Sequence, residues 1–309
     1  MTIKEFVKRS PILYNAFKAA RNTRNSISNL VPDEPYIKMQ YRKQMGKKID
    51  LNNPQTFNEK IQWMKLYDRN PLMTKCADKY EVRSYVEEKI GKGILNKLYG
   101  VYEKVEDIDL LVLPNSFVIK VNHGSGQNIL CRDKTQMDFN KAFSRIKDYM
   151  RTNHYHYGRE WAYKNIKPLI ILEEYLDDHG RPPDDYKILC FHGKPEIIQI
   201  DLDRFGDHRR NYYNVDWTQM DLQFIKNNSS EEVPKPQHLD EMLSYAAALA
   251  EGFHFVRIDF YNFDGKLYFG EMTFYPNNGI GTFYPVENNN MMGNKLKLPA
   301  RNVTSIQQT

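Results

Sequence analysis

Two carboxylates stand in an otherwise apolar stretch near the end of the chain, VRIDFYNFDGKLYFGEMTFYPNNGIG, residues 256–281. Asp259 and Glu271 flank an Asp-Gly pair, which predicts two antiparallel strands joined by a turn. Two carboxylates held close together repel each other unless a cation lies between them, and Mg²⁺ prefers such hard oxygen ligands. The pattern therefore predicts a magnesium site, and two solvated carboxylates on an open sheet face are the alternative.

The length of the turn decides whether the two carboxylates share a face. A two-residue loop pairs Asp259 with Gly270 and sends Glu271 to the opposite face, because side chains alternate along a strand. A three-residue loop, Phe263-Asp264-Gly265, instead pairs Arg257 with Glu271. We favour this longer loop, which gathers four polar side chains on one face of the hairpin: Arg257, Asp259, Glu271 and Thr273.

A second stretch, KVNHGSGQN, has residue types that suit phosphate binding. A predicted strand ends near Lys120, and the loop after it contains Gly124, Ser125 and Gly126. Glycines allow backbone N–H groups to approach a phosphate, and a nearby lysine supplies charge. The stretch lacks the Gly-Lys-Ser/Thr of a Walker motif, so the residues alone leave an ordinary hairpin turn as the alternative.

Three further groups of polar residues have a chemical interpretation. Glu173 and Glu174 end an apolar strand, where a carboxylate can accept a hydrogen bond from an amino group or a ribose. The stretch DLDRFGDHRR is rich in cations that can clamp phosphate or carboxylate, or form a solvated basic loop; they are Arg204, His208, Arg209 and Arg210. His154 and His156 have no third ligand at a useful spacing, so we do not expect them to bind metal.

Composition predicts a globular protein with two or three lobes. The 309 residues are 41% hydrophobic and include 21 tyrosines, which excludes disorder as the main state. The three cysteines have neither zinc spacing nor a disulfide framework. Residues 1–48 hold eleven lysines and arginines against three acidic residues, and show no signal peptide or apolar run of the about 20 residues that span a bilayer.

We therefore expect a cytoplasmic protein. Its basic N-terminus either forms a solvated helical arm packed on the body or makes peripheral contact with anionic lipid at the inner face of the membrane. The basic residues form no recognisable nucleic-acid-binding module, so nucleic acid is not an expected partner. Helical spacing of apolar residues predicts a basic helical arm over 1–50 and a mainly helical region over 51–116. Hairpins interspersed with helices follow over 117–175 and 176–298, before a tail at 299–309, which makes the fold class α+β.

The order of these features resembles the ATP-grasp superfamily, in which two α+β lobes close on ATP. The Arg-x-Asp and Glu-x-Asn-x-x-Pro-Gly strands of that superfamily are similar to RID and GEMTFYPNNG, although Thr273 replaces the asparagine. Five ordered stretches over about residues 50–298 resemble the TupA-like ATP-grasp proteins associated with bacterial surface polysaccharides such as teichuronopeptides. They are NPQTFNEKIQWMKLYDRNP, ADKYEVRSYVEEKIG, NHGSGQN, DDYKILCFHGKP and YFGEMTFYP.

The resemblance implies a role for each candidate in the nucleotide site. Lys79 and Lys120 resemble the two lysines that hold the ATP phosphates, under a loop formed by Gly124, Ser125 and Gly126. Glu173 resembles the residue that meets the adenine amino group, and the residues after it, Glu174, Tyr175 and Leu176, belong to the adenine slot. Asp185 resembles the ribose partner.

The resemblance also implies the metal-binding and catalytic residues. Asp259 and Glu271, with Thr273, would bind Mg²⁺, and Arg257 would meet the transferred phosphoryl group. Lys187 would face the same cleft, and the loop containing Arg204 would contact the substrate. The implied cofactors are ATP and Mg²⁺.

The resulting functional prediction is an ATP-dependent carboxylate–amine ligase in bacterial cell-surface polysaccharide biosynthesis. An acyl phosphate would give an amide between substrates such as a uronic-acid-containing glycan and an amino acid. Asp201-Leu202-Asp203 also resembles the metal motif of glycosyltransferases, but such an enzyme needs an N-terminal βαβ region, whereas residues 1–116 are expected to be mainly helical. An ATP-dependent sugar kinase is a further alternative, because it would share the nucleotide half of the site.

Overall fold

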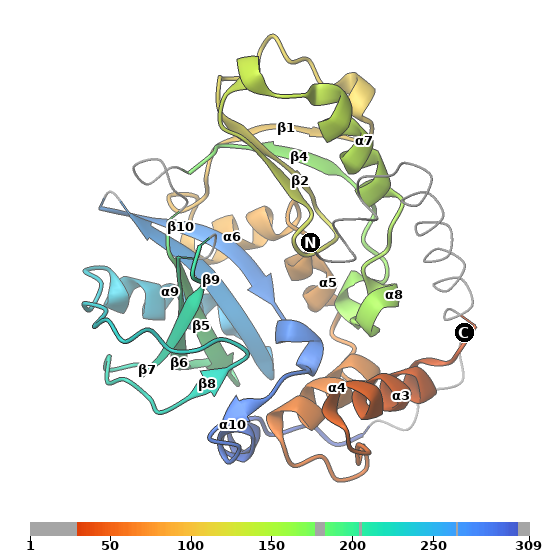
Figure 1. Cartoon of the computed structure of the whole chain (residues 1–309), viewed down its shortest axis with the longest axis vertical. Coiled ribbons are helices and arrows are strands. Elements are labelled where there is room, and N and C mark those ends of the chain that lie inside the picture. Colours follow the sequence, from red (N-terminus) through yellow and green to blue (C-terminus); the bar gives the residue numbers. More distant parts are fainter. Residues whose placement is uncertain (1–29, 177–182, 204–205, 264, 302–309) are drawn as a thin grey trace.

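A computed structural model describes residues 30–176, 183–203, 206–263 and 265–301. The described residues form a four-stranded, a five-stranded and a two-stranded antiparallel sheet with helices packed around them (Figure 1), which confirms the α+β class. The predicted basic arm falls largely on residues 1–29 and the C-terminal tail on 302–309, both outside the described residues. No helix in the described part of the chain is long and apolar enough to cross a bilayer.

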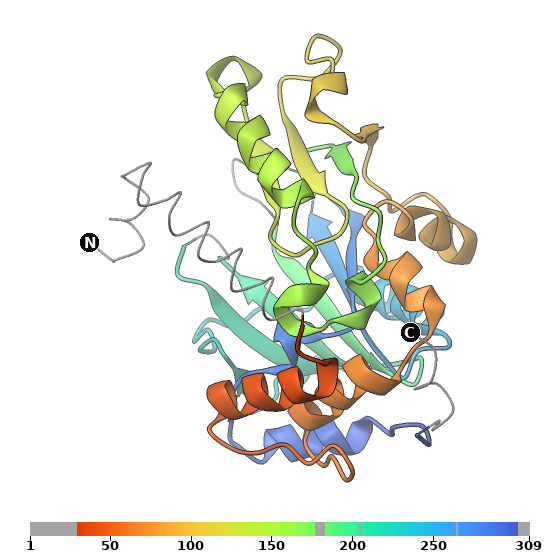
Figure 2. The ribbon, with the colours of Figure 1, turned by 90° about the vertical axis from the view of Figure 1, so that its right-hand side faces the viewer.

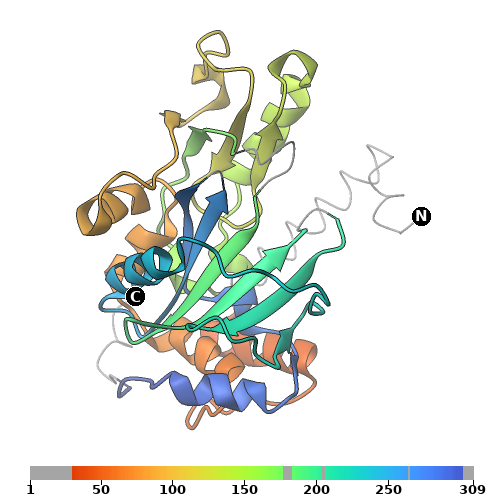
Figure 3. The same ribbon diagram turned by 90° about the vertical axis from the view of Figure 1, so that its left-hand side faces the viewer.

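The small lobe is a four-stranded sheet covered by helix α7 (Phe139–Met150). Its strand order is β1-β4-β2-β3, and the strands are β1 (Leu98–Tyr102), β2 (Phe117–Val121), β3 (Asn128–Cys131) and β4 (Ile170–Glu173). Asp138 begins the helix by accepting a hydrogen bond from the backbone N–H of Lys141 at 3.0 Å. Buried Ala142 and Ile146 pack into a core that belongs to this lobe alone. Figures 2 and 3 show the lobe standing above the rest of the molecule.

Strand β1 lies within residues 51–116, for which the sequence predicts mainly helices. Three helices do fill the first part of that range, namely α4 (Phe57–Tyr67), α5 (Pro71–Ala77) and α6 (Val82–Ile90). Leu98 then pairs with Glu173 and Tyr102 with Ile170, so the small lobe begins earlier than expected. Every residue of β1 is half-buried, and the strand therefore lacks the alternation of buried and exposed positions that reveals a strand in a sequence.

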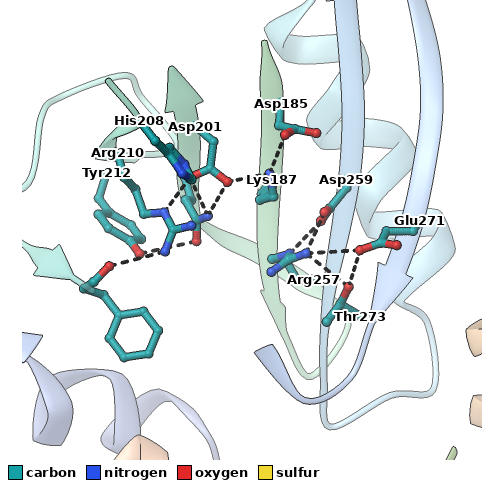
Figure 4. A network of polar contacts seen from close by, with 12 residues as sticks. Asp185, Lys187, Asp201, His208, Arg210, Tyr212, Arg257, Asp259, Glu271 and Thr273 are labelled. Carbon is teal, nitrogen blue, oxygen red and sulfur yellow. Dashed lines mark hydrogen bonds and ion pairs between the residues drawn. The ribbon is translucent and has the colours of Figure 1, made fainter. Parts of the chain in front are cut away.

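The large lobe is a five-stranded sheet with the order β10-β9-β5-β6-β7. Its strands are β5 (Asp185–Phe191), β6 (Lys194–Leu202), β7 (Arg209–Asn214), β9 (Phe255–Phe263) and β10 (Lys266–Thr273). Helix α9 (Leu239–Ala250) packs against it through buried Met242, Ala246 and Leu249. A charged set of side chains, drawn in Figure 4, extends across all five strands of the sheet. This polar set contains the candidate site.

Distant parts of the chain close the base of the large lobe. Thr56 and Glu59 form a capping box at the start of α4, and Phe57 makes ring contacts with Phe191 and Phe255. Helix α10 (Asn288–Lys295) lies beside α4 (Figure 1). The remaining elements are α3 (Asp33–Met45), α8 (Tyr155–Gly158), β8 (Gln223–Phe224) and β11 (Phe283–Tyr284), with short 3₁₀ turns between them.

Gly293 of α10 packs against the backbone at the start of α4, and its replacement should destabilise the fold. A Cβ added at Gly293 would lie 2.2 Å from the backbone oxygen of Gln55. Alanine gains about 1 kcal/mol in helix propensity, but the clash with backbone costs about 1–3 kcal/mol, so Gly293→Ala should lower stability and the melting temperature. Gly93→Ala is the control because its Cβ would meet nothing within 4 Å. Equal melting temperatures for the two variants would contradict this packing.

Candidate active site

The β9–β10 hairpin has a different register from the one predicted. Phe263 pairs with Lys266, so the three-residue loop prediction is wrong; Asp264 itself lies outside the described residues. Gly270 forms a bulge between the pairs Phe269–Phe260 and Glu271–Asp259, and this extra residue returns Glu271 to the face of Asp259. A Cβ at Gly270 would lie 3.0 Å from the Asp259 carbonyl oxygen, which explains why glycine suits the bulge. An isolated glycine inside a strand pattern is the signal that indicates such a bulge.

The four polar side chains of the hairpin nevertheless meet on one face, as predicted (Figure 4). Arg257 donates from Nε and Nη2 to the two carboxylate oxygens of Asp259, both at 2.6 Å. The same Nη2 lies 3.5 Å from Glu271 Oε1 and donates to Thr273 Oγ1 at 3.1 Å. Thr273 in turn donates to Glu271 at 3.2 Å. One guanidinium therefore links both candidate metal ligands.

Burial and ion pairing together shift the pKa values of Asp259 and Arg257. Asp259 is 4% exposed, and burial raises its pKa to about 6, although Arg257 and Lys187 oppose the shift. Burial also disfavours the Arg257 cation, but Asp259 outweighs burial and raises the pKa of Arg257 above its usual value. A second cation next to such a buried carboxylate would stabilise its ionised form.

The carboxylate pair fits Mg²⁺ that is shared with a nucleotide. Within the described ranges, no group of three or more His, Cys, Asp or Glu side chains is placed to hold a metal. A cation here would therefore bind Asp259 and Glu271 and complete its shell with oxygens from outside the protein, with the Thr273 hydroxyl nearby. Mg²⁺ commonly binds in this way, through one or two carboxylates plus phosphate oxygens and water.

Lys79 joins the glycine loop to the hairpin. Its Nζ donates to the Gly124 carbonyl oxygen at 2.6 Å and lies 3.5 Å from Glu271 Oε2. Its backbone N–H donates to the Asn122 carbonyl oxygen at 3.1 Å, which fixes the lysine beside the loop after β2. This cation therefore lies between the predicted phosphate loop and the predicted metal ligands.

Lys120 is held by a buried glutamate. Its Nζ lies 2.5 Å from Glu173 Oε2, and Arg83 and Asn96 donate to the same carboxylate at 3.2 and 3.3 Å. Burial opposes the ionisation of Glu173, but Lys120 and Arg83 outweigh burial and lower its pKa. Glu173 thus fixes cations at the base of the small lobe. It directly precedes Glu174, which lines the cleft, and its contact with adenine stays a prediction.

A cleft with a cavity volume of about 210 Å³ lies between the two lobes, and most of the predicted nucleotide-binding residues line it. Ten of its lining residues were predicted from sequence: Lys79, Lys120, Ser125, Gly126, Glu174, Tyr175, Leu176, Asp185, Asp259 and Glu271. The apolar walls of the cleft, which include Val118, Leu130 and Phe269, were not predicted from the sequence. The sequence indicated only that these three residues lie in apolar strands. An apolar slot with polar groups at one end suits a flat base attached to phosphates.

The other predicted residues lie next to the cleft or outside the described residues. Gly124 accepts from Lys79, while Arg257 and Thr273 lie behind the two carboxylates. Lys187 is 4% exposed, and its Nζ is 2.7 Å from Asp201 and 3.1 Å from Asp185, so it does not line the cleft. Arg204, which was predicted to contact the substrate, lies outside the described residues.

The two aspartates of the Asp-x-Asp stretch have separate partners. Asp201 is buried, and although burial disfavours its charge, Lys187 and Arg210 hold its pKa well below the usual range. Arg210 Nε donates to it at 2.5 Å, and His208 Nε2 lies 3.2 Å away (Figure 4). Asp203 instead accepts from the backbone N–H of Asp207 at 2.7 Å. This arrangement does not favour a shared metal, and the described elements before β1 are all helices.

A family model described as "TupA-like ATPgrasp" matches residues 59–297, which is well over half of the chain. The chain belongs to the TupA-like ATP-grasp family. Membership places it in a superfamily of ATP-dependent ligases with an α+β fold, and the two lobes and the cleft described above are those of an ATP-grasp protein.

Three solved structures that are similar to this chain are ligases. A D-alanine–D-alanine ligase from Bacillus anthracis complexed with ATP is 14% identical, with a TM-score of 0.37 over 64% of this chain and 53% of that one. The Helicobacter pylori D-alanine–D-alanine ligase is 14% identical, with a TM-score of 0.44 over 78% and 69%. The ligase PsnB with a minimal precursor, Mg and ADP is 9% identical, with a TM-score of 0.39 over 77% and 66%. No curated protein matches this chain.

Lys120 should contribute directly to ATP affinity. Lys120→Ala removes a charge-assisted contact of about 1.5–3 kcal/mol, which corresponds to about a tenfold or greater loss of ATP binding. Isothermal titration with ATP and Mg²⁺ measures the change. Lys141→Ala, on the exposed side of α7 in the same lobe, is the control for loss of one positive charge. An unchanged ATP dissociation constant for Lys120→Ala would exclude Lys120 from the phosphate site.

Proposed function

We propose that this protein is an ADP-forming carboxylate–amine ligase. One observation carries the proposal: Lys79 and Lys120 line the same cleft as the Asp259–Glu271 pair. Two cations and two carboxylates that line one cleft suit a magnesium-bound triphosphate, whose negative charge needs both the lysines and the metal. Family membership supports the same interpretation.

The lining residues suggest how ATP binds. The adenine would lie between the apolar side chains of Val118, Leu130 and Phe269, and Asp185 would receive the ribose hydroxyls. Backbone N–H groups of the loop containing Ser125 and Gly126 would donate to the phosphates beside the two lysines. Mg²⁺, when bound to the two carboxylates, would neutralise charge on the terminal phosphates.

The ligase reaction has two chemical steps. A substrate carboxylate attacks the γ-phosphorus of ATP, giving an acyl phosphate and ADP. An amine then attacks the acyl carbon, giving an amide and inorganic phosphate. Arg257 would attract the negative charge of the acyl phosphate, because its guanidinium lies within 3.5 Å of Glu271 at the phosphate end of the cleft. Catalysis would depend mainly on the alignment of the reacting groups.

We further propose that the carboxylate and the amine come from bacterial cell-surface polysaccharide assembly. A uronic-acid-containing glycan and an amino acid are the proposed pair, because the TupA-like family is associated with such polymers. A requirement for ATP would place the reaction in the cytoplasm, and the basic N-terminus would allow it to occur near the inner face of the membrane.

Product analysis tests this function. The protein is incubated with ATP, Mg²⁺, pooled amino acids and uronic acids, and mass spectrometry reads the nucleotide and any new amide. ADP together with an amide supports the ligase. AMP would exclude the acyl-phosphate route, and a phosphorylated sugar would indicate a kinase. In a parallel incubation with a nucleotide sugar, release of UDP would indicate a glycosyltransferase.

Two variants compare the hairpin with the Asp-x-Asp stretch. Glu271→Gln keeps the shape of the side chain but removes an anionic ligand, so magnesium-dependent turnover should fall by about 10²-fold or more while the melting temperature stays near that of the wild type. Asp203→Asn should change turnover by less than about twofold, because asparagine can still accept the hydrogen bond from Asp207. ADP release and thermal unfolding measure both effects. An active Glu271→Gln beside an inactive but stable Asp203→Asn would refute the proposed mechanism.

A further inference from the structure

The loop between β2 and β3, residues 122–127, is the predicted phosphate loop, and Thr152 contacts it near both ends. Near the start of the loop, the buried His123 lies 2.9 Å from the Thr152 carbonyl oxygen through Nε2. At the end of the loop, Gln127 Nε2 donates to Thr152 Oγ1 at 3.1 Å. The backbone N–H of Val121 donates to the Gln127 carbonyl oxygen at 3.2 Å and closes the loop at its base. One threonine from outside the loop therefore holds both of its sides.

Thr152 is itself fixed at the end of helix α7. Its hydroxyl donates to the Tyr149 carbonyl oxygen at 2.7 Å, and its backbone N–H donates to the same oxygen at 3.0 Å. The hydroxyl hydrogen is thus used by Tyr149, and a lone pair of Oγ1 remains to accept from Gln127. Thr152 does not belong to the described residues that line the cleft. An effect of its side chain on a bound nucleotide therefore has to pass through the loop.

Gln127 lines the cleft and lies directly against Gly124. A Cβ added at Gly124 would lie 2.1 Å from Gln127 Oε1, so the side-chain amide packs on this glycine. Within the described part of the chain, Gln127 Oε1 is buried and accepts no hydrogen bond. The hydrogen bond from Nε2 to Thr152 is therefore the polar contact that orients the amide over Gly124.

The position of Gly124 affects the metal end of the cleft. Its carbonyl oxygen accepts from Lys79 Nζ at 2.6 Å, and the same Nζ lies 3.5 Å from Glu271 Oε2. Lys79 and Glu271 line the cleft together with Ser125 and Gly126 of the loop. A shift of Gly124 would therefore displace a phosphate-binding lysine and the backbone N–H groups of the loop at the same time.

We propose that Gln127 is a positioning residue that holds the phosphate loop in the conformation that binds ATP, through its hydrogen bond to Thr152. This inference rests on the proposed function, of which it uses only the binding of ATP and Mg²⁺ in the cleft. The amide acts on the phosphates through Gly124, which it covers. Two glycines give the loop a large conformational freedom, and a side-chain anchor reduces the entropy loss that opposes ATP binding.

Binding measurements on paired variants test this role. Isothermal titration with Mg²⁺ gives the dissociation constants of ATP and of AMP for the wild type, Gln127→Ala, Thr152→Val and the double variant. Thr152→Val keeps the shape of the side chain but removes the oxygen that accepts from Gln127, whereas Thr152→Ser keeps that oxygen. Thr135→Val is the matched control, because Thr135 is exposed in the same lobe and its hydroxyl donates to Asp133 at 2.7 Å.

We expect Gln127→Ala and Thr152→Val each to weaken ATP binding by about three- to tenfold, as the loss of one hydrogen bond does. The double variant should bind ATP no more weakly than Gln127→Ala, because both changes remove the same anchor. Thr152→Ser and Thr135→Val should stay within about twofold of the wild type. AMP lacks the β- and γ-phosphates, so its affinity should change by less than about twofold in every variant, which also shows that each variant is folded.

Four results would overturn the role of Gln127. They are wild-type ATP binding by Thr152→Val, additive losses in the double variant, an equal loss in Thr152→Ser, or an equal loss of AMP affinity. Additive losses would show that Gln127 contributes to ATP binding independently of Thr152. A wild type that binds no ATP would refute the nucleotide site and this role with it, whereas a wild type that binds ATP but forms no amide would refute only the ligase function.

Discussion

The constraint on which the site depends is the cost of keeping charges inside the large sheet. Charges of opposite sign lie next to one another: Arg257 pairs with Asp259 on the same strand, β9, and Lys187 pairs with Asp185 on β5 and with Asp201 on β6. Desolvation penalises each of these charges, and only a close partner offsets the penalty. The charged side chains therefore have to share one face of the sheet, and the bulge at Gly270 brings Glu271 to that face, within 3.5 Å of Arg257.

The same constraint divides the polar set into two parts. Toward β6 and β7, Asp201 is surrounded by Lys187, Arg210 and His208, so its charge is fully compensated. Toward β9 and β10, Asp259 and Glu271 share one guanidinium, and burial raises the pKa of Asp259 to about 6. An additional cation is therefore favoured next to Asp259 and Glu271, which line the cleft.

Much of the fold and of the nucleotide site could be predicted from the sequence because the signals were local. Period-two alternation indicated the β9–β10 hairpin, and glycines beside Lys120 indicated a loop able to approach phosphate. What failed depended on contacts between distant residues. The register required the Gly270 bulge, and β1 formed a strand only by pairing with β4. The ion pair between Glu173 and Arg83 likewise depends on α6, which lies far from β4 in the sequence.

The position of Lys79 links the binding of two ligands to this protein. Its ammonium group is shared between the Gly124 carbonyl oxygen and Glu271, so the phosphate loop and the metal ligands compete for one cation. A triphosphate that attracts Lys79 would release Glu271 for a metal ion, and a metal ion on Glu271 would release Lys79 for the triphosphate. Under the proposed function, nucleotide and cation would therefore be thermodynamically coupled, and by reciprocity each would increase the affinity of the protein for the other by the same factor.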